Sequence, residues 1–224
     1  VEIDTITIDH LRLWRKAIAS ESTLYADHPN RKPVPNKHRS VYTLDQYVRA
    51  ARRFFRWLYI EGRIDRNPAQ HLERPPLPSQ RRRGIPKSDV ARLLKTAQQE
   101  HKVREFAIIR LLADTACRVG GLAGLKLEDL DLDHRRAIVH EKGRGGNHKE
   151  RLIFLEPLTV SAISAYLEIR PKCDDPHLFI AKGHRNSPGF HGLTESGISQ
   201  AIKAIAIKAK ITKGYNPHNF RHGA

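Results

Sequence analysis

The stretch that decides how the chain is interpreted reads Asn216-Pro217-His218-Asn219-Phe220-Arg221-His222. Asn216 is a favourable N-cap and Pro217 suits the first helical position, so the stretch predicts the start of a helix. His218 and Arg221 are three residues apart and therefore project from one helical face. An arginine can hold phosphate oxygens through two parallel hydrogen bonds, while a histidine can move a proton. The pair therefore indicates phosphate chemistry.

The composition indicates a folded protein that binds a polyanion. The chain has 224 residues, of which 39% are apolar, so it can form one large domain or two modest ones. Lys and Arg number 40 against 24 Asp and Glu, and the net charge of +16 is spread along the sequence. This charge favours nucleic acid as the partner. A membrane is disfavoured, because no basic amphipathic helix dominates and no apolar run reaches spanning length.

The cysteines indicate the cellular compartment, and the chain ends indicate whether the sequence is a fragment. Cys117 and Cys173 show neither metal-binding nor disulfide spacing, which favours a reducing, cytoplasmic compartment. No cofactor is indicated. The sequence contains no methionine, even at residue 1, and stops soon after the histidine-arginine motif. We therefore expect the chain to be a fragment trimmed at both ends.

The first half of the sequence predicts a helical domain. Thr7 can cap a helix in which Leu11, Trp14 and Ile18 recur at helical spacing. A second helix is expected from Thr43 to Tyr59. Its apolar stripe consists of Leu44, Val48, Ala51, Phe55 and Leu58.

A stripe of arginines runs beside this apolar stripe. It comprises Arg49, Arg52, Arg53 and Arg56. Such a stripe is often only the solvated face of a helix. With no acidic residue among the four arginines, a face that follows DNA phosphates is the better interpretation.

A proline-rich basic segment separates the two halves. Residues 75–84 contain three prolines that make the segment stiff and three arginines that attract phosphate. The arginines are Arg81, Arg82 and Arg83. We therefore expect a helical domain at 1–74, a linker at 75–84 and a second domain at 85–224.

The second half predicts helices around a small sheet. A helix with an apolar stripe over Val90–Ala97 precedes an almost wholly apolar, buried helix at Phe106–Ala113. Thr115 can cap the next helix, which would carry Arg118 in its first turn. Further helices are expected over Val160–Leu167 and after Thr194.

The sheet is expected between these helices. Arg136–His140 and Arg151–Leu155 read as paired strands around a mobile, glycine-rich basic hairpin loop at 142–149. His177–Ala181 reads as another short strand. The expected fold class is mainly α with a small antiparallel sheet.

Basic residues recur where an enzyme acting on phosphodiesters needs them. Arg118 and Arg221 could hold the two non-bridging oxygens of a pentacovalent phosphate, where losing one donor costs about 10² to 10³ in rate. Lys142, on a glycine-rich hairpin, could protonate the leaving oxygen. Lys149 is a rival for this role, but the glycines beside Lys142 favour Lys142. Arg151 and Lys149 are expected to contact backbone or solvent.

Three segments of the sequence resemble the tyrosine recombinases, the lambda-type integrases. Asp114–Leu125, followed by Glu128–Leu132, resembles the first arginine box of that family. Glu141–Gly143 with His148–Leu155 is similar to its lysine hairpin, and Pro217–His222 to its His-x-x-Arg-His box. The first half resembles the family's helical core-binding domain through Phe54-Phe55-Arg56-Trp57-Leu58, then Gly62 and Asn67-Pro68-Ala69. The resemblance implies a core-binding domain joined to an incomplete α+β catalytic domain.

The resemblance also implies a role for each site residue. Arg118 and Arg221 would clamp the scissile phosphate, and Lys142 would be the general acid for the leaving 5′ oxygen. His218 would assist proton transfer, and His222 would support the site. In the family a tyrosine attacks double-stranded DNA and forms a 3′-phosphotyrosyl bond without metal or ATP. A protein that is monomeric when free would exchange strands as a homotetramer on DNA.

Two positions depart from the family pattern. The family carries an acidic residue three positions after the first arginine, where this chain has Gly121, which implies that Arg118 is less firmly held. Neither Tyr166 nor Tyr215 matches the position of the nucleophile, which belongs beyond residue 224. We therefore expect the chain to bind DNA without cleaving it.

Other interpretations remain open. His218 and His222 could in principle hold zinc, but Asn219 stands where a metalloprotease has glutamate, and no third ligand is evident. A recombinase-derived DNA-binding protein without catalysis would share the same motifs. So would a type IB topoisomerase-like enzyme, while an RNA-binding helical protein would share the charge.

Overall fold

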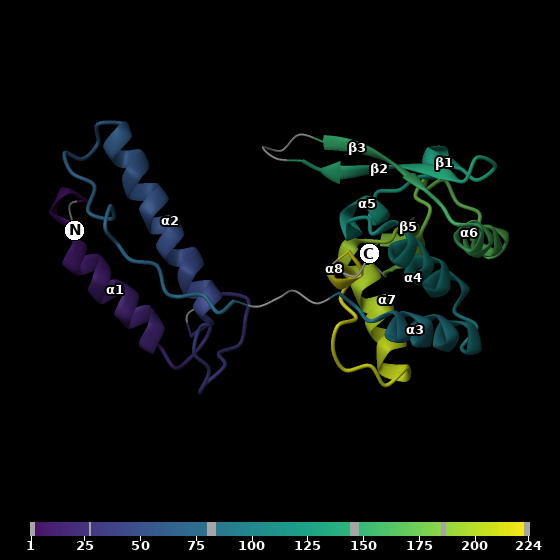
Figure 1. The fold of residues 1–224 in the computed structure, drawn as a ribbon, viewed down its shortest axis with the longest axis horizontal. Helices are drawn as coiled ribbons and strands as arrows, with labels where there is room; N and C mark the ends of the chain where they lie inside the picture. The colour runs from purple at the N-terminus through teal and green to yellow at the C-terminus, as the bar shows by residue number, and fades with distance from the viewer. Residues whose placement is uncertain (1–2, 27, 80–83, 144–147, 185–186, 222–224) are drawn as a thin grey trace. The chain divides into compact units, whose positions relative to one another are not determined.

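The computed structural model describes the backbone of residues 3–26, 28–79, 84–143, 148–184 and 187–221. Among these residues it leaves out the side chains of Lys142, His148 and His184. The chain divides into two compact units, Val1–Gln80 (unit 1) and Arg81–Ala224 (unit 2), and Figure 1 labels the helices and strands of each. None of the described helices is long and apolar enough to cross a membrane.

Unit 1 consists of a short 3-10 turn, η1 (Ile3–Thr5), and two helices, α1 (Ile8–Ser20) and α2 (Val41–Ile60). Thr7 caps α1 as predicted, by accepting a hydrogen bond from the His10 backbone. The second helix is confirmed but begins earlier than expected, because Ser40 caps it through the backbone N–H of Thr43.

The core of unit 1 is a single small cluster of side chains. The predicted stripe of α2 is buried at Val48, Phe55 and Leu58, whereas on α1 only Leu11 is buried and Trp14 is exposed. The cluster consists of Leu11, Val48, Phe55, Leu58, Ile64, Ala69 and Leu72.

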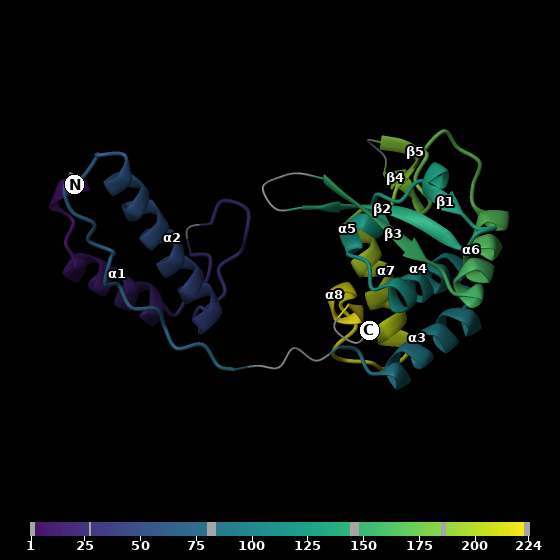
Figure 2. The ribbon, with the colours of Figure 1, turned by 45° about the horizontal axis from the view of Figure 1, so that its top comes forward.

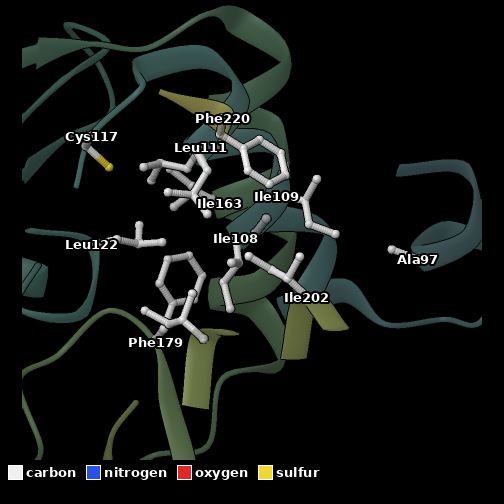
Figure 3. Packing of buried hydrophobic residues seen from close by; sticks show 14 of the residues in the cluster. Ala97, Ile108, Ile109, Leu111, Cys117, Leu122, Ile163, Phe179, Ile202 and Phe220 are labelled. Carbon is white, nitrogen blue, oxygen red and sulfur yellow. The ribbon is translucent and has the colours of Figure 1, made fainter. Parts of the chain in front are cut away.

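Unit 2 is mainly helical, and its central helix is α4. Its four long helices are α3 (Lys87–Gln99), α4 (Val103–Thr115), α6 (Pro157–Ile169) and α7 (Glu195–Lys208). Helix α4 contacts the other three and is apolar on most sides, as its sequence predicts. Figure 3 shows Ile108 and Leu111 of α4 near Ile163, Ile202 and Phe220 of the surrounding helices. Thr194 caps α7 as predicted, by accepting from the Gly197 backbone.

The main sheet is antiparallel with the order β1-β2-β3. Its strands are β1 (Leu130–Asp131), β2 (Arg136–Lys142) and β3 (His148–Phe154). The paired strands are confirmed, but they extend farther than expected: Lys142 is the last residue of β2 and pairs with His148, and Glu141 pairs with Lys149. The prediction that Lys142 and Lys149 lie in the hairpin loop is therefore wrong. Residues 144–147 lie outside the described part of the chain.

A second, two-stranded antiparallel sheet pairs β4 (Ile180–His184) with β5 (Ser187–Gly192). The predicted strand at His177–Ala181 is therefore placed too early, because His177 forms only an isolated bridge to Lys126. Strand β5 was not predicted.

Two short helices complete unit 2, α5 (Val119–Ala123) and α8 (Pro217–Phe220), with a 3-10 turn, η2 (Leu127–Asp129), between α5 and β1. The predicted cap of α8 is confirmed, since the Asn216 side chain accepts from the His218 backbone. The predicted cap of α5 is wrong. Thr115 ends α4, where its hydroxyl donates to the Leu111 carbonyl, and Arg118 itself is the N-cap of α5. The fold is thus mainly helical with small antiparallel sheets, as expected.

Candidate active site

Arg118 lies at a sharp turn between the buried helix α4 and the short helix α5. Ala116 ends α4 in the left-handed conformation, with φ of 49°. The chain then runs extended through Arg118 into α5. The Arg118 side chain is 51% exposed, so the guanidinium group reaches solvent from a backbone fixed by the core.

The side chain that holds Arg118 is Glu141, near the end of β2. Glu141 is buried, with 4% of its surface exposed. One carboxylate oxygen accepts the backbone N–H of Arg118 at 2.9 Å, and the other accepts the Arg118 guanidinium. Helix α5 packs against β2, and Figure 2 shows the two elements side by side. The expectation that Arg118 is loosely held for want of an acid at residue 121 is therefore wrong.

Glu141 also brings in Arg221, the predicted partner of Arg118. Nη1 of Arg221 lies 3.7 Å from a Glu141 carboxylate oxygen, an ion pair longer than a hydrogen bond. Among the described residues this buried nitrogen has no hydrogen-bond acceptor. The structure thus places the two predicted arginines around one carboxylate, although they come from distant parts of the sequence.

Helix α8 fixes Arg221 through its buried face. Pro217 and Phe220 are buried, Arg221 follows as the C-cap, and His218 is exposed one turn earlier. The Asn219 carbonyl accepts the backbone N–H of Ile85 at 3.1 Å, which ties α8 to the first residues of unit 2. The helix that carries His218, and that Arg221 caps, is therefore anchored to the core of unit 2.

The charge state of Glu141 follows from its surroundings. Burial alone would raise the pKa of Glu141, but the hydrogen bond from the Arg118 backbone and three guanidinium charges outweigh burial and hold the pKa below its ordinary value. These charges belong to Arg118, Arg151 and Arg221. The carboxylate is therefore ionised at neutral pH and attracts the arginines.

Arg151 contributes from β3. Its guanidinium donates to the Thr115 carbonyl at 3.0 Å, so the prediction that Arg151 contacts backbone is confirmed. This bond ties β3 to the end of α4, next to the turn that carries Arg118. Arg151 is only partly exposed and holds the backbone just before Arg118.

Lys142 directly follows Glu141 in the sequence and is the last residue of β2. Its side chain is outside the described residues, as are His222 and the linker arginines Arg81, Arg82 and Arg83. In the described part of the chain, no cluster of three or more His, Cys, Asp or Glu side chains could hold a metal ion.

The arginine stripe of unit 1 borders a hollow on the surface. Arg52, Arg53 and Arg56 line a depression of about 890 Å³ together with Arg66 and Tyr59. All four predicted arginines of α2 are exposed. The hollow therefore offers several cationic groups to an anionic ligand such as a phosphate backbone.

Arg49 differs from the other three because it has a carboxylate partner. Its Nε lies 3.1 Å from the buried Asp45, which also accepts two hydrogen bonds from Arg74. The Arg74 hydrogen bond is the main reason that the pKa of Asp45 lies below its ordinary value. Among the described residues Arg49 therefore forms an ion pair, whereas Arg52, Arg53 and Arg56 do not.

Sequence reasoning missed Glu141 and Asp45 as site-supporting residues. Asp45 lies one helical turn before Arg49, a spacing that signals an ion pair. Glu141 gives only one signal, a carboxylate beside the candidate lysine, because its partners come from other elements. Its role requires the tertiary structure.

Comparison with known proteins extends these observations. Residues 83–224 match the model of the phage integrase family. The chain is 30% identical over 194 residues to the tyrosine recombinase XerD of Listeria monocytogenes serotype 4b, covering 82% of this chain and 61% of that protein. It is 28% identical over 216 residues to XerC of Xanthomonas campestris pv. campestris, covering 93% of this chain and 63% of that protein. The chain thus spans less than two thirds of these relatives.

Solved structures give the same result for the fold. The crystal structure of XerA recombinase matches with a TM-score of 0.54 and 25% identity, over 99% of this chain and 69% of that one. The Tn1549 transposon integrase, in complex with a circular intermediate DNA, matches with a TM-score of 0.68 and 17% identity, over 98% and 72%. The match of residues 83–224 to the family model and the identity to XerD agree with the resemblance of the sequence motifs. The chain therefore belongs to the phage integrase family, the tyrosine recombinases.

Proposed function

We propose that this chain is the DNA-binding and phosphate-holding part of a site-specific recombinase that breaks and rejoins double-stranded DNA. The observation that carries the proposal is the ion-paired group of Arg118, Glu141 and Arg221. Arg221 has a buried nitrogen without an acceptor among the described residues, and the Arg118 side chain is half-exposed. Two such groups suit the two non-bridging oxygens of a phosphodiester.

The chemistry assigned to these residues is transesterification at phosphorus. A tyrosine oxygen attacks, a 3′-phosphotyrosyl bond forms, and the bond to the 5′ oxygen breaks. Arg118 and Arg221 stabilise the charge that develops on the phosphate. Lys142 donates the proton to the leaving 5′ oxygen, while His218 moves the proton of the nucleophile and His222 supports the site. Rejoining is the reverse reaction with a 5′ hydroxyl.

The nucleophile is not among the tyrosines near these boxes. Tyr166 is buried, and its hydroxyl accepts the backbone N–H of Ile180. Tyr215 packs, partly buried, against the core of unit 2. Neither occupies the position that the resemblance expects. We therefore propose that residues 1–224 bind DNA but do not cleave it by themselves.

In this proposal DNA is held by both units. Residues 1–74 form the core-binding domain, and Arg52, Arg53 and Arg56 follow its phosphates, with Arg49 contributing less. Residues 75–84 form the linker, whose three arginines add further phosphate contacts, and residues 85–224 belong to the catalytic domain. The lambda integrase dimer of the same fold was solved bound to a core site, which supports DNA as partner. The protein would act in the cytoplasm, as a homotetramer at synapsis.

The test is trapping of the covalent intermediate. A DNA site selected by residues 1–224 from a random duplex pool is nicked next to the cleavage point and incubated with the complete gene product. We expect a denaturation-resistant adduct whose released strand carries a 5′ hydroxyl. Residues 1–224 serve as the binding-only control. A 5′-linked adduct, or tighter binding of 1–224 to RNA than to duplex DNA at equal salt, contradicts the proposal.

A further inference from the structure

The residue whose contacts the assigned chemistry does not explain is Glu141. We propose that Glu141 is a positioning residue that fixes both arginines, in place of an acidic side chain at residue 121. This inference rests on the proposed function of Arg118 and Arg221.

The hydrogen bonding at the start of α5 supports the proposal that Glu141 does what an acidic side chain at residue 121 would do. Arg118 is the N-cap of α5, so Gly121 is its third helical residue. In a capping box, an acidic side chain at that third position reaches back to the N-cap backbone N–H. Here the Arg118 N–H is accepted by Glu141, which reaches it from β2. The acid is supplied by a neighbouring strand rather than by the helix.

The space around Gly121 shows that a side chain at this position would crowd Glu141. A Cβ atom added at Gly121 would lie 3.2 Å from Cγ of Glu141 and 3.4 Å from Cβ of Val139. A longer side chain at residue 121 would occupy the volume that Glu141 fills. The glycine therefore makes room for the carboxylate, and the two features belong together.

The electrostatics explain what the carboxylate does. A buried, ionised carboxylate is stable only when it is paired, so Glu141 restricts the guanidinium groups that neutralise it. It binds the Arg118 backbone and side chain and lies within ion-pair distance of Arg221. One buried carboxylate on β2 therefore positions both arginines.

The first test replaces Glu141 by glutamine, which keeps the size and the acceptor but removes the charge. In the complete gene product we expect Glu141→Gln to lower the single-turnover cleavage rate at saturating DNA by about 10²-fold, as for a small displacement of catalytic groups. Affinity for DNA should change little. The control is Glu150→Gln on β3, whose side chain is 72% exposed. An unchanged cleavage rate in Glu141→Gln overturns the proposal.

The second test moves the acid to the helix. Glu141→Ala vacates the space beside Gly121, and Gly121→Glu in that background returns a carboxylate to the Arg118 N–H. We expect the double variant to regain at least about a tenth of the cleavage rate that Glu141→Ala alone loses. Gly121→Gln in the same background caps the helix without charge and should not recover it. A folded Glu141→Ala, Gly121→Glu variant that recovers no more than its glutamine counterpart overturns the proposal.

A third measurement separates this inference from the proposed function, because it needs no cleavage. In residues 1–224, side-chain NMR signals of Arg118 and Arg221 should show faster guanidinium motion in Glu141→Gln. Arg92, which donates to the Ala209 carbonyl, is the internal reference. If the unsubstituted gene product does not cleave DNA although both arginines are restricted, the proposed function is rejected and the role of Glu141 is kept. Unrestricted arginines in the unsubstituted chain would reject the role of Glu141.

Discussion

Arg118 and Arg221 are held with different strength. Arg118 gives Glu141 both its backbone N–H and its guanidinium, whereas Arg221 reaches the same carboxylate only at 3.7 Å. Arg221 also has the buried nitrogen that finds no hydrogen-bond acceptor among the described residues. A buried donor without an acceptor is costly, so a phosphate oxygen that binds there gains more than one that replaces an existing bond.

We predict that Arg221→Ala lowers DNA cleavage by the complete gene product about 10²- to 10³-fold. Arg221→Lys should also be impaired, because an ammonium cannot hold two oxygens in a plane. Duplex binding should be largely kept, since most phosphate contacts lie elsewhere. Single-turnover rates and band-shift affinities measure the two effects, and Lys95→Ala, on the exposed side of α3, is the control. Cleavage by Arg221→Ala at the unsubstituted rate would remove Arg221 from the site.

At this scale the sequence predicts local contacts well, whereas the pairing of the distant residues Arg118 and Arg221 follows from their phosphate chemistry and from the family resemblance. The capping of α8 and its buried and exposed faces could be predicted, because Asn216, Pro217 and the helical period act within a few residues. The role of Glu141 could not, because its partners Arg118 and Arg221 come from α5 and α8. The family resemblance marks Gly121 as the position of a missing acid, and only the fold shows that Glu141 accepts the backbone N–H of Arg118.

At the scale of elements, the two faces of α2 have different roles. One face is buried against α1 and the following loop, and the other exposes arginines over the hollow of unit 1. Within the described residues, Arg53 and Arg56 form no ion pair, whereas Arg49 pairs with Asp45. Arg53 and Arg56 therefore break no ion pair of the described residues when they meet a phosphate.

We predict that Arg53→Ala and Arg56→Ala each reduce the slope of log affinity against log salt by about 0.9, the contribution of one phosphate contact. Arg49→Ala, the matched control on the same helix, should reduce the slope less, because Asp45 already neutralises its charge. Titration of residues 1–224 with duplex DNA at several salt concentrations gives the slopes. Equal effects of Arg49→Ala and Arg53→Ala would show that the ion pair does not matter for binding.

The elements could be predicted where a period repeats over several turns, as in α2, α4 and α7. Strand β5 could not, because Pro188 and Gly189 interrupt any alternating pattern. The start of α5 was placed wrongly because Ala116 adopts a left-handed conformation, which alanine does not signal. This turn moves Arg118 from the first helical turn to the N-cap.

At the scale of the whole molecule, each unit has its own hydrophobic core. The larger cluster gathers α3, α4, α6 and α7 with the inner face of the main sheet, and the smaller one joins α1 and α2. The site residues Arg118 and Arg221 both belong to elements packed on the larger core. The relative positions of Arg118 and Arg221 therefore depend on the packing around α4.

We predict that Leu111→Ala destabilises unit 2 by about 2 to 5 kcal/mol, the usual cost of a cavity at a buried leucine. Leu111 is fully buried, whereas Leu158 on α6 is 65% exposed. Leu158→Ala is therefore the control and should change stability little. Denaturant unfolding with hydrogen exchange at the amides of α4 and α7 reports the loss. Equal stability of the two variants would contradict the assigned core.

The net charge of +16 predicts steep salt dependence for the whole chain. If residues 1–224 contact six to ten phosphates, affinity should fall by about 10³- to 10⁵-fold between 50 and 200 mM salt. Fluorescence anisotropy with a labelled duplex measures this fall. Affinity that is insensitive to salt would argue against phosphate tracking by either unit.

The contact of Arg221 with Glu141 also bears on how the protein folds. Arg118, Glu141 and Arg221 lie far apart in the sequence, and Ile85, which binds the same short helix as Arg221, is the first described residue of unit 2 with a buried side chain. Contacts between such distant segments form late in folding, because closing the long intervening loop costs entropy. We therefore expect the two arginines to come together only when unit 2 folds as a whole, so that a partly folded chain holds a phosphate poorly.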